Sequence, residues 1–88
     1  MSKITFTEKG WEEYQYWLGE NRKVLQKIAQ LLKSIERDGP LNGEGQPERL
    51  LYAEDEYSRR IDKKNRLVYR VDGDQIIVEA CLGHYEDQ

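Results

Sequence analysis

Hydrophobic and polar side chains alternate most regularly between Tyr57 and Val71. The second part of this stretch has the period of two that is typical of a half-buried strand. One side carries Leu67, Tyr69 and Val71, and the other carries Arg66, Val68 and Arg70. The polar segment 62–65, with the sequence DKKN, separates this strand from an earlier one. The pattern therefore predicts a β-hairpin over residues 57–71.

Two segments in the first half of the chain carry hydrophobic residues at helical spacing. The clearer one has them at i, i+4, i+7, i+8 and i+11, which is one face of an α-helix. These residues are Val24, Ile28, Leu31, Leu32 and Ile35. Asn21 is a suitable N-cap for this helix, and Gly39-Pro40 is expected to end it. A helix of about 12 residues is predicted before it, with Thr7 as N-cap and Trp11, Tyr14 and Leu18 on its apolar side.

Three further strands complete the predicted fold. They are Lys3–Phe6, a short edge strand at Arg49–Tyr52, and Gln75–Leu82 after a tight turn at Asp72-Gly73. The order β-α-α-β-β-β is typical of an α+β domain. We expect one domain over residues 1–88, with an antiparallel sheet of about four to five strands. The N-terminal pair of helices should pack on one face, which leaves Arg66 and Arg70 on the uncovered face.

The charge distribution points to an anion site on the hairpin. The chain has 88 residues and a net charge of −3. Six of its 14 basic residues nevertheless lie between positions 57 and 70, against the single acid Asp62; they are Arg59, Arg60, Lys63, Lys64, Arg66 and Arg70. Such a local concentration favours a phosphate ligand. The negative net charge of the chain argues against nonspecific binding to nucleic acid, because such binding needs a broad basic surface.

The cysteine and hydropathy patterns limit the location and the cofactors. Cys81 is the single cysteine, so no intrachain disulfide is possible, and a reducing, cytoplasmic location is expected. Cys81 is most simply a small core residue. One cysteine and one histidine cannot form a structural zinc site, and we expect no metal and no cofactor. The sequence has neither an apolar run long enough for a membrane span nor the apolar core of a signal peptide.

Three residue types together would serve the cleavage of RNA. RNA carries its own nucleophile, the 2′-OH, so cleavage needs a base, a cation for the developing charge, and an acid for the departing 5′-oxygen. Glu48, Arg66 and His84 form a minimal set for these roles. Each also has a plain alternative: Glu48 as a solvated glutamate, the arginines as a solvated hairpin face, and His84 as a structural or surface histidine.

The chain resembles the YoeB/Txe-type toxins of bacterial type II toxin–antitoxin systems, in the RelE superfamily. The resemblance covers nearly the whole chain. It rests on Trp11, Tyr14, Tyr16 and Trp17, on the loop Gly43-x-Gly45-x-Pro47-Glu48-x-Leu50, on Tyr57-Ser58-Arg59-Arg60-Ile61, on Asn65-Arg66-Leu67-Val68-Tyr69, and on His84-Tyr85. These motifs are specific in combination, and each alone is weak.

The resemblance implies an endoribonuclease that cuts mRNA in the ribosomal A site and inhibits translation. It implies Glu48 as general base, Arg66 as phosphate clamp, His84 as general acid and Tyr85 as a residue that orients the substrate. RNA contacts are expected from four basic residues of the hairpin, namely Arg59, Arg60, Lys63 and Arg70. The implied partners are the ribosome, mRNA and a cognate antitoxin of the YefM/Phd-like or Axe-like kind, with a homodimer or a toxin–antitoxin hetero-oligomer.

This sequence departs from the family pattern in three places. Family members are usually basic, whereas this chain is acidic. Leu51 stands where the family often has a lysine, and the tail Glu86-Asp87-Gln88 follows the His-Tyr pair at which the family commonly ends. Two alternatives therefore remain: a non-catalytic module that binds an antitoxin and has lost ribosome-dependent cleavage, and a ribonuclease that acts on free RNA.

The last strand raises a geometric question about His84. Strict alternation from Ile76 places His84 on the apolar side of the sheet, away from Arg66. A β-bulge or the end of the strand near Gly83 would bring the two residues to the same side. We therefore predict such an irregularity.

Overall fold

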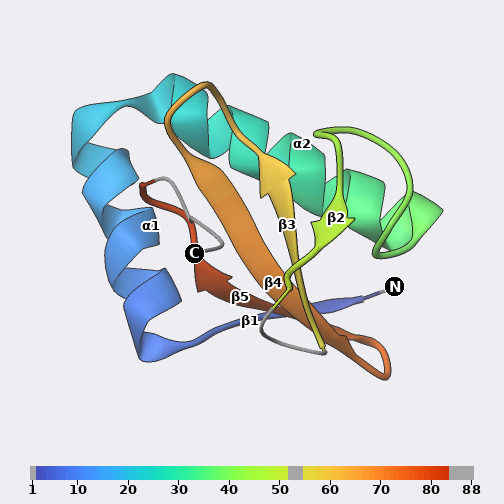
Figure 1. The fold of residues 1–88 in the computed structure, drawn as a ribbon. Helices are drawn as coiled ribbons and strands as arrows, with labels where there is room; N and C mark the ends of the chain where they lie inside the picture. Colours follow the sequence, from blue (N-terminus) through green and yellow to red (C-terminus); the bar gives the residue numbers. More distant parts are fainter. Residues whose placement is uncertain (1, 52–54, 84–88) are drawn as a thin grey trace.

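The computed structural model describes residues 2–51 and 55–83 and forms a five-stranded sheet with two helices (Figure 1). The elements are β1 (Lys3–Phe6), α1 (Glu8–Glu20), α2 (Arg22–Asp38), β2 (Glu48–Arg49), β3 (Glu56–Arg60), β4 (Arg66–Asp72) and β5 (Gln75–Ala80). The strand order in the sheet is β1-β5-β4-β3-β2. The predicted α+β architecture is confirmed, although four strands rather than the three of the predicted order follow the helices.

One strand pairing differs from the sequence expectation. The pairs β2–β3, β3–β4 and β4–β5 are antiparallel, but β1 lies parallel to β5. The sheet is therefore mixed rather than wholly antiparallel. The two helices lie between these paired strands in the sequence, and a parallel pair needs such a long connection. The predicted edge strand is present as β2, one residue earlier and shorter than expected.

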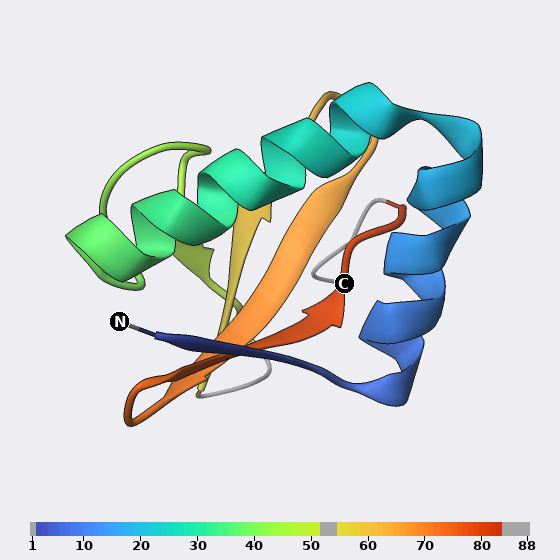
Figure 2. The same cartoon turned by 180° about the vertical axis from the view of Figure 1, so that it is seen from behind.

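Helix α2 covers one face of the sheet. Figure 2 shows it crossing in front of β4, while Figure 1 looks onto the opposite face. Its predicted apolar face is confirmed: the buried hydrophobic residues are Val24, Ile28, Leu31 and Ile35. The predicted caps are confirmed as well, because the Asn21 side chain accepts a hydrogen bond from the Lys23 N–H at 3.1 Å. Gly39 ends the helix at a φ of 93°, a backbone conformation that glycine adopts readily.

Helix α1 buries a different side from the one that its hydrophobic spacing predicts. Trp11 and Leu18 are 47% and 45% exposed, whereas Gly10 and Trp17 are buried. The reason is that Gly10 lets α1 approach the backbone of β5, where a Cβ at this position would overlap the Val78 carbonyl. Trp11 lies instead against the rings of Phe6 and Tyr14, with centroids 5.5 and 5.9 Å away.

This close approach makes Gly10 a sensitive position. Gly10→Ala is expected to destabilise the fold by about 1–3 kcal/mol, because the added methyl group must push α1 away from β5. Gly19→Ala is the matched control in the same helix, where a Cβ meets nothing within 4 Å. Since alanine favours helix, this control should raise stability by at most about 1 kcal/mol. Urea unfolding measures both values, and equal effects of the two variants would contradict this packing.

A β-bulge interrupts the pairing of β4 with β5. Val68 pairs with Ala80 and Tyr69 with Val78, so Glu79 is the extra residue. The bulge reverses the alternation: Val78 belongs to the core under the helices, whereas Ala80 packs with Val68 and Leu50 on the opposite face. The predicted irregularity is therefore present, four residues before Gly83. The strand itself ends at Ala80.

Candidate active site

Two of the predicted catalytic residues meet on the sheet face that the helices leave uncovered. Arg66 Nη1 donates hydrogen bonds to Glu48 Oε2 at 3.0 Å and to Ser58 Oγ at 3.2 Å. The Arg66 side chain is 16% exposed and the Glu48 side chain 57% exposed. The pair thus combines a nearly buried cation with a carboxylate that solvent reaches.

The strand register explains how distant parts of the sequence form this pair. Glu48 of β2 pairs with Ser58 of β3, and Arg60 of β3 pairs with Arg66 of β4. Residues two apart on a strand share a face, so Ser58 and Arg60 lie on the same side as Arg66. The small apolar cluster of Leu50, Val68 and Ala80 lies on this side as well. Ser58 was missed as a site residue, although its two-residue spacing from Arg60 in the hairpin indicates the same face.

The end of the described chain lies beside Arg66. The Arg66 N–H donates to the Gly83 carbonyl at 3.1 Å, and the Gly83 N–H donates to Asn65 Oδ1 at 2.8 Å. Gly83 has a φ of 92°, so the chain leaves the extended conformation at this point. His84 and Tyr85 lie outside the described residues. The structure does describe Gly83, which directly precedes His84 and lies next to the backbone of Arg66.

Arg59 has a place that corrects one sequence expectation. Its side chain is 0% exposed and lies under α2, where RNA cannot reach it. The guanidinium donates to Ser34 Oγ at 2.9 Å and to Tyr69 Oη at 2.9 Å. It also donates to the backbone carbonyls of Gly39, Asn42 and Glu44, at 2.8, 2.6 and 2.7 Å. The prediction that Arg59 contacts RNA is therefore wrong, and this residue instead holds the loop that leads to Glu48.

The remaining basic residues of the hairpin differ in their surroundings. Arg60 and Lys63 are exposed. Arg70 lies on the same face as Arg66 but forms an ion pair with Glu79. The hydrogen bond that Arg70 donates to Glu79, together with the charge of this carboxylate, raises the pKa of the Arg70 guanidinium. Glu56 of β3 pairs with Arg70, and burial and the nearby charge of Glu79 raise the pKa of the Glu56 carboxyl. An RNA phosphate would have to compete with Glu79 for Arg70.

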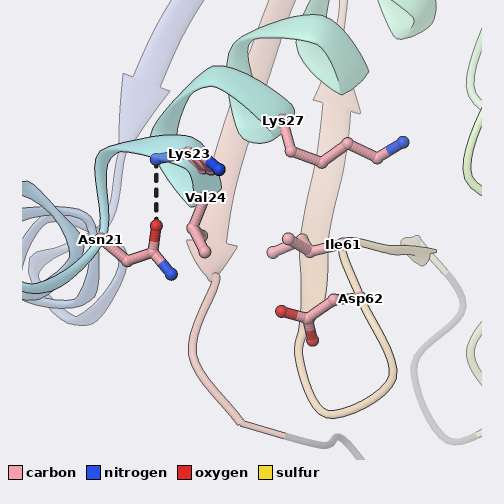
Figure 3. Close-up of a pocket in the computed structure, with 6 residues that line it drawn as sticks. All are labelled: Asn21, Lys23, Val24, Lys27, Ile61 and Asp62. Atoms are coloured by element: carbon pink, nitrogen blue, oxygen red, sulfur yellow. Dashed lines mark hydrogen bonds between the residues drawn. The ribbon is translucent and has the colours of Figure 1, made fainter.

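A hollow of about 340 Å³ lies between the start of α2 and the hairpin turn (Figure 3). It is lined by Asn21, Lys23, Val24, Lys27, Ile61 and Asp62. Lys23 and Lys27 come from α2, and the exposed Lys63 and Lys64 follow Asp62 in the turn. This end of the molecule is thus basic, although the chain as a whole is acidic.

The structure supplies no alternative chemistry at Cys81. The thiol is buried, and burial together with the charge of Glu13 raises its pKa to about 12. A thiol with this pKa is almost wholly protonated and unreactive at neutral pH. The expectation of a small core residue is confirmed. Within residues 2–51 and 55–83, no three His, Cys, Asp or Glu side chains cluster as metal ligands would, and neither helix is long and apolar enough to cross a membrane.

Comparisons with known proteins define the family to which this chain belongs. Residues 6–85 match the model of the YoeB-like toxin of bacterial type II toxin-antitoxin systems. A Streptomyces coelicolor protein named Toxin YoeB is 44% identical over 84 residues, which cover 94% of this chain and 99% of that protein. The chain belongs to the YoeB toxin family.

Solved structures agree with this assignment. The YoeB dimer from Staphylococcus aureus superimposes with a TM-score of 0.91 at 44% identity, covering 96% of this chain and 98% of that one. A heterotetrameric YoeB-YefM toxin-antitoxin complex from the same organism gives a TM-score of 0.89 at 43% identity, covering 97% and 99%. The predicted family and fold are therefore confirmed.

Proposed function

We propose that this protein is a ribosome-dependent endoribonuclease that cleaves mRNA in the ribosomal A site and thereby inhibits translation. The observation that carries the proposal is the contact between Arg66 and Glu48 on the uncovered face, beside the residue that leads into His84. A base and a cation thus lie in one small region, next to the residue that precedes the proposed acid. Such a substrate places the protein in the cytoplasm.

The proposed reaction needs only groups of the protein and the RNA. Glu48 takes the proton of the 2′-OH, whose oxygen attacks the adjacent phosphorus. Arg66 stabilises the negative charge that develops on the phosphorane oxygens. The bond from phosphorus to the 5′-oxygen then breaks, and His84 donates a proton to that oxygen, while Tyr85 orients the substrate. The products are a 2′,3′-cyclic phosphate and a free 5′-OH.

The geometry of Arg66 suits this role. Both of its side-chain contacts described above use Nη1. A guanidinium also carries donors on Nε and Nη2, in a fork that matches two phosphate oxygens. Contact with Ser58 holds the group in place before the substrate arrives. A phosphate that binds Arg66 would also lie close to the Glu48 carboxylate, where the base is required.

Mapping of mRNA 5′ ends in a translating extract tests the proposal. We expect new 5′ ends within codons only when the protein is added, and none with Glu48→Ala. Cleavage of purified RNA without ribosomes would support a free ribonuclease instead. Intact mRNA together with continued translation would refute the proposal.

A second candidate is a non-catalytic module that binds an antitoxin. The observation in its favour is the net charge of −3, which weakens attraction to ribosomal RNA. Growth after induced expression separates the two candidates, because only the nuclease arrests growth, and only its arrest is abolished by His84→Gln. For either candidate we propose a YefM-like antitoxin partner and assembly as a homodimer or a toxin–antitoxin complex.

The exposed basic end of the hairpin should anchor the RNA backbone. Plotted against log salt concentration, log(kcat/KM) should fall with a negative slope. Arg60→Ala and Lys63→Ala are each expected to make this slope less steep by about 0.7–1, because each removes one phosphate contact. Lys33→Ala is the matched control, since Lys33 is an exposed lysine of α2 beside Ser2 and Glu36, outside the hollow of Figure 3. An equal change of slope for all three variants would show that the basic end has no special role.

A further inference from the structure

The three residues that follow β5 are held by hydrogen bonds from two directions. Glu13 of α1 accepts, through Oε1, the N–H groups of Cys81 at 2.7 Å and Leu82 at 3.0 Å. The Trp17 indole N–H donates to the Cys81 carbonyl at 2.8 Å. From the other direction, the Gly83 N–H donates to the Asn65 side chain, and the Gly83 carbonyl accepts a hydrogen bond from the Arg66 N–H, as described above. We call Glu13 and Asn65 the clasp residues.

The clasp replaces the sheet pairing that is lost when β5 ends. Beyond Ala80, the backbone N–H groups of residues 81, 82 and 83 no longer donate to β4 as they would within the sheet. Each instead donates a hydrogen bond to a side-chain oxygen. Hydrogen bonds to an ionised carboxylate are about twice as strong as neutral ones. A strand end that would otherwise fray is therefore fixed at three consecutive residues.

The orientation of Asn65 is fixed as well. Its Nδ2 donates to the two Asp62 carboxylate oxygens at 3.1 and 3.2 Å. Because an ionised carboxylate only accepts hydrogen bonds, the amide nitrogen must face Asp62 and the amide oxygen must face Gly83. The hairpin turn thus presents a preset acceptor to the end of the chain.

We propose that Glu13 and Asn65 are positioning residues: they fix residues 81–83, which directly precede His84, and thereby support the proton transfer assigned to His84. This inference rests on the proposed function. Asn65 directly precedes Arg66, and Gly83 directly precedes His84, so the clasp joins the two catalytic residues through adjacent positions. A misplacement of about 1 Å in a catalytic group can cost about 10²-fold in rate.

A change of leaving group distinguishes this positioning role from a merely structural one. In ordinary RNA, the departing 5′-oxygen needs the proton of the general acid. When sulfur replaces this bridging oxygen, the bond from phosphorus to sulfur breaks and the thiolate leaves without a proton. A variant that misplaces only His84 should therefore recover on the 5′-thio substrate. Damage to the fold, to Glu48 or to Arg66 should slow both substrates equally.

The experiment measures single-turnover cleavage of both mRNAs on programmed ribosomes. Glu13→Ala and Asn65→Ala are each expected to lower cleavage of ordinary mRNA by about 10–100-fold and to cleave the 5′-thio mRNA within about threefold of wild type. Glu13→Gln keeps the acceptor oxygen and should stay within about threefold on both substrates. Glu12→Ala is the matched control, because it removes an exposed carboxylate from the neighbouring position of α1. His84→Gln calibrates the recovery on the 5′-thio mRNA.

Each outcome decides the inference. Wild-type rates for Glu13→Ala and Asn65→Ala on ordinary mRNA would overturn it, and so would equal losses on both substrates. Thermal unfolding of each variant identifies one that does not fold, in which case the other clasp variant carries the test. If the wild-type protein cleaves neither mRNA, the proposed function itself fails, and this result differs from either failure of the clasp.

Discussion

Replacing Arg66 with alanine is expected to lower mRNA cleavage by about 10²–10³-fold, the usual loss when one preorganised group that stabilises transition-state charge is removed. The arginine donates hydrogen bonds to Glu48 and to Ser58, which together hold its guanidinium in place. Its removal leaves the phosphorane charge without this guanidinium. Single-turnover cleavage on programmed ribosomes measures the effect, and kcat should fall rather than KM alone.

Two controls separate this effect from damage to the fold. An ion pair with a partner as exposed as Glu48 contributes at most about 1 kcal/mol to stability. Arg66→Ala should therefore unfold at nearly the wild-type urea concentration. Arg66→Lys keeps the charge but loses the planar fork, and it should recover only part of the rate. A fully active Arg66→Ala protein would exclude Arg66 from catalysis.

Replacing Arg59 with alanine is expected to destabilise the fold by about 3–5 kcal/mol, because several buried groups lose their charged hydrogen-bond donor at once and each unsatisfied group costs about 1–3 kcal/mol. The Arg59 guanidinium donates hydrogen bonds to three backbone carbonyls, to Ser34 and to Tyr69. Its removal leaves these acceptors under α2 without their donor. A domain of this size has a total stability of about 4–13 kcal/mol. Urea unfolding should show the loss directly.

Arg60→Ala is the matched control for this prediction. Arg60 is the next residue of β3 and is exposed, so its removal should change stability by no more than about 0.5 kcal/mol. The two variants should also differ in the cause of any lost activity: Arg60→Ala weakens RNA binding in a folded protein, whereas Arg59→Ala loses activity in proportion to the fraction of the protein that unfolds. Equal stabilities would contradict the structural role of Arg59.

Much of the fold could be predicted from short-range sequence patterns. The apolar face of α2, both helix N-caps and the alternation of β4 are short-range features, and the structure confirms each of them. The same alternation places Arg66 opposite the core. The contact of Arg66 with Glu48 could be expected only in outline, because it depends on the register of two other strands.

Features that depend on long-range packing could not be predicted in this way. The burial of Gly10 and the parallel pairing of β1 arise where α1 and β1 meet β5, which is more than 60 residues away in the sequence. The bulge at Glu79 lies between β4 and β5, and the alternation of hydrophobic residues in β5 does not show at which residue it occurs. Arg59 is a different case. It lies two residues from both Tyr57 and Ile61, so the alternation alone places its side chain on the core side of the sheet. Its positive charge nevertheless led to the expectation that it contacts RNA. The loop carbonyls that accept its hydrogen bonds reverse that expectation.

The most direct test of the central claim uses an mRNA with a single 2′-deoxy nucleotide on the 5′ side of the bond that is cut. If RNA supplies the nucleophile beside Arg66 and Glu48, cleavage at that bond should be abolished, while the all-ribose mRNA yields a 2′,3′-cyclic phosphate end. Cleavage of both mRNAs at the same bond and the same rate would contradict the account.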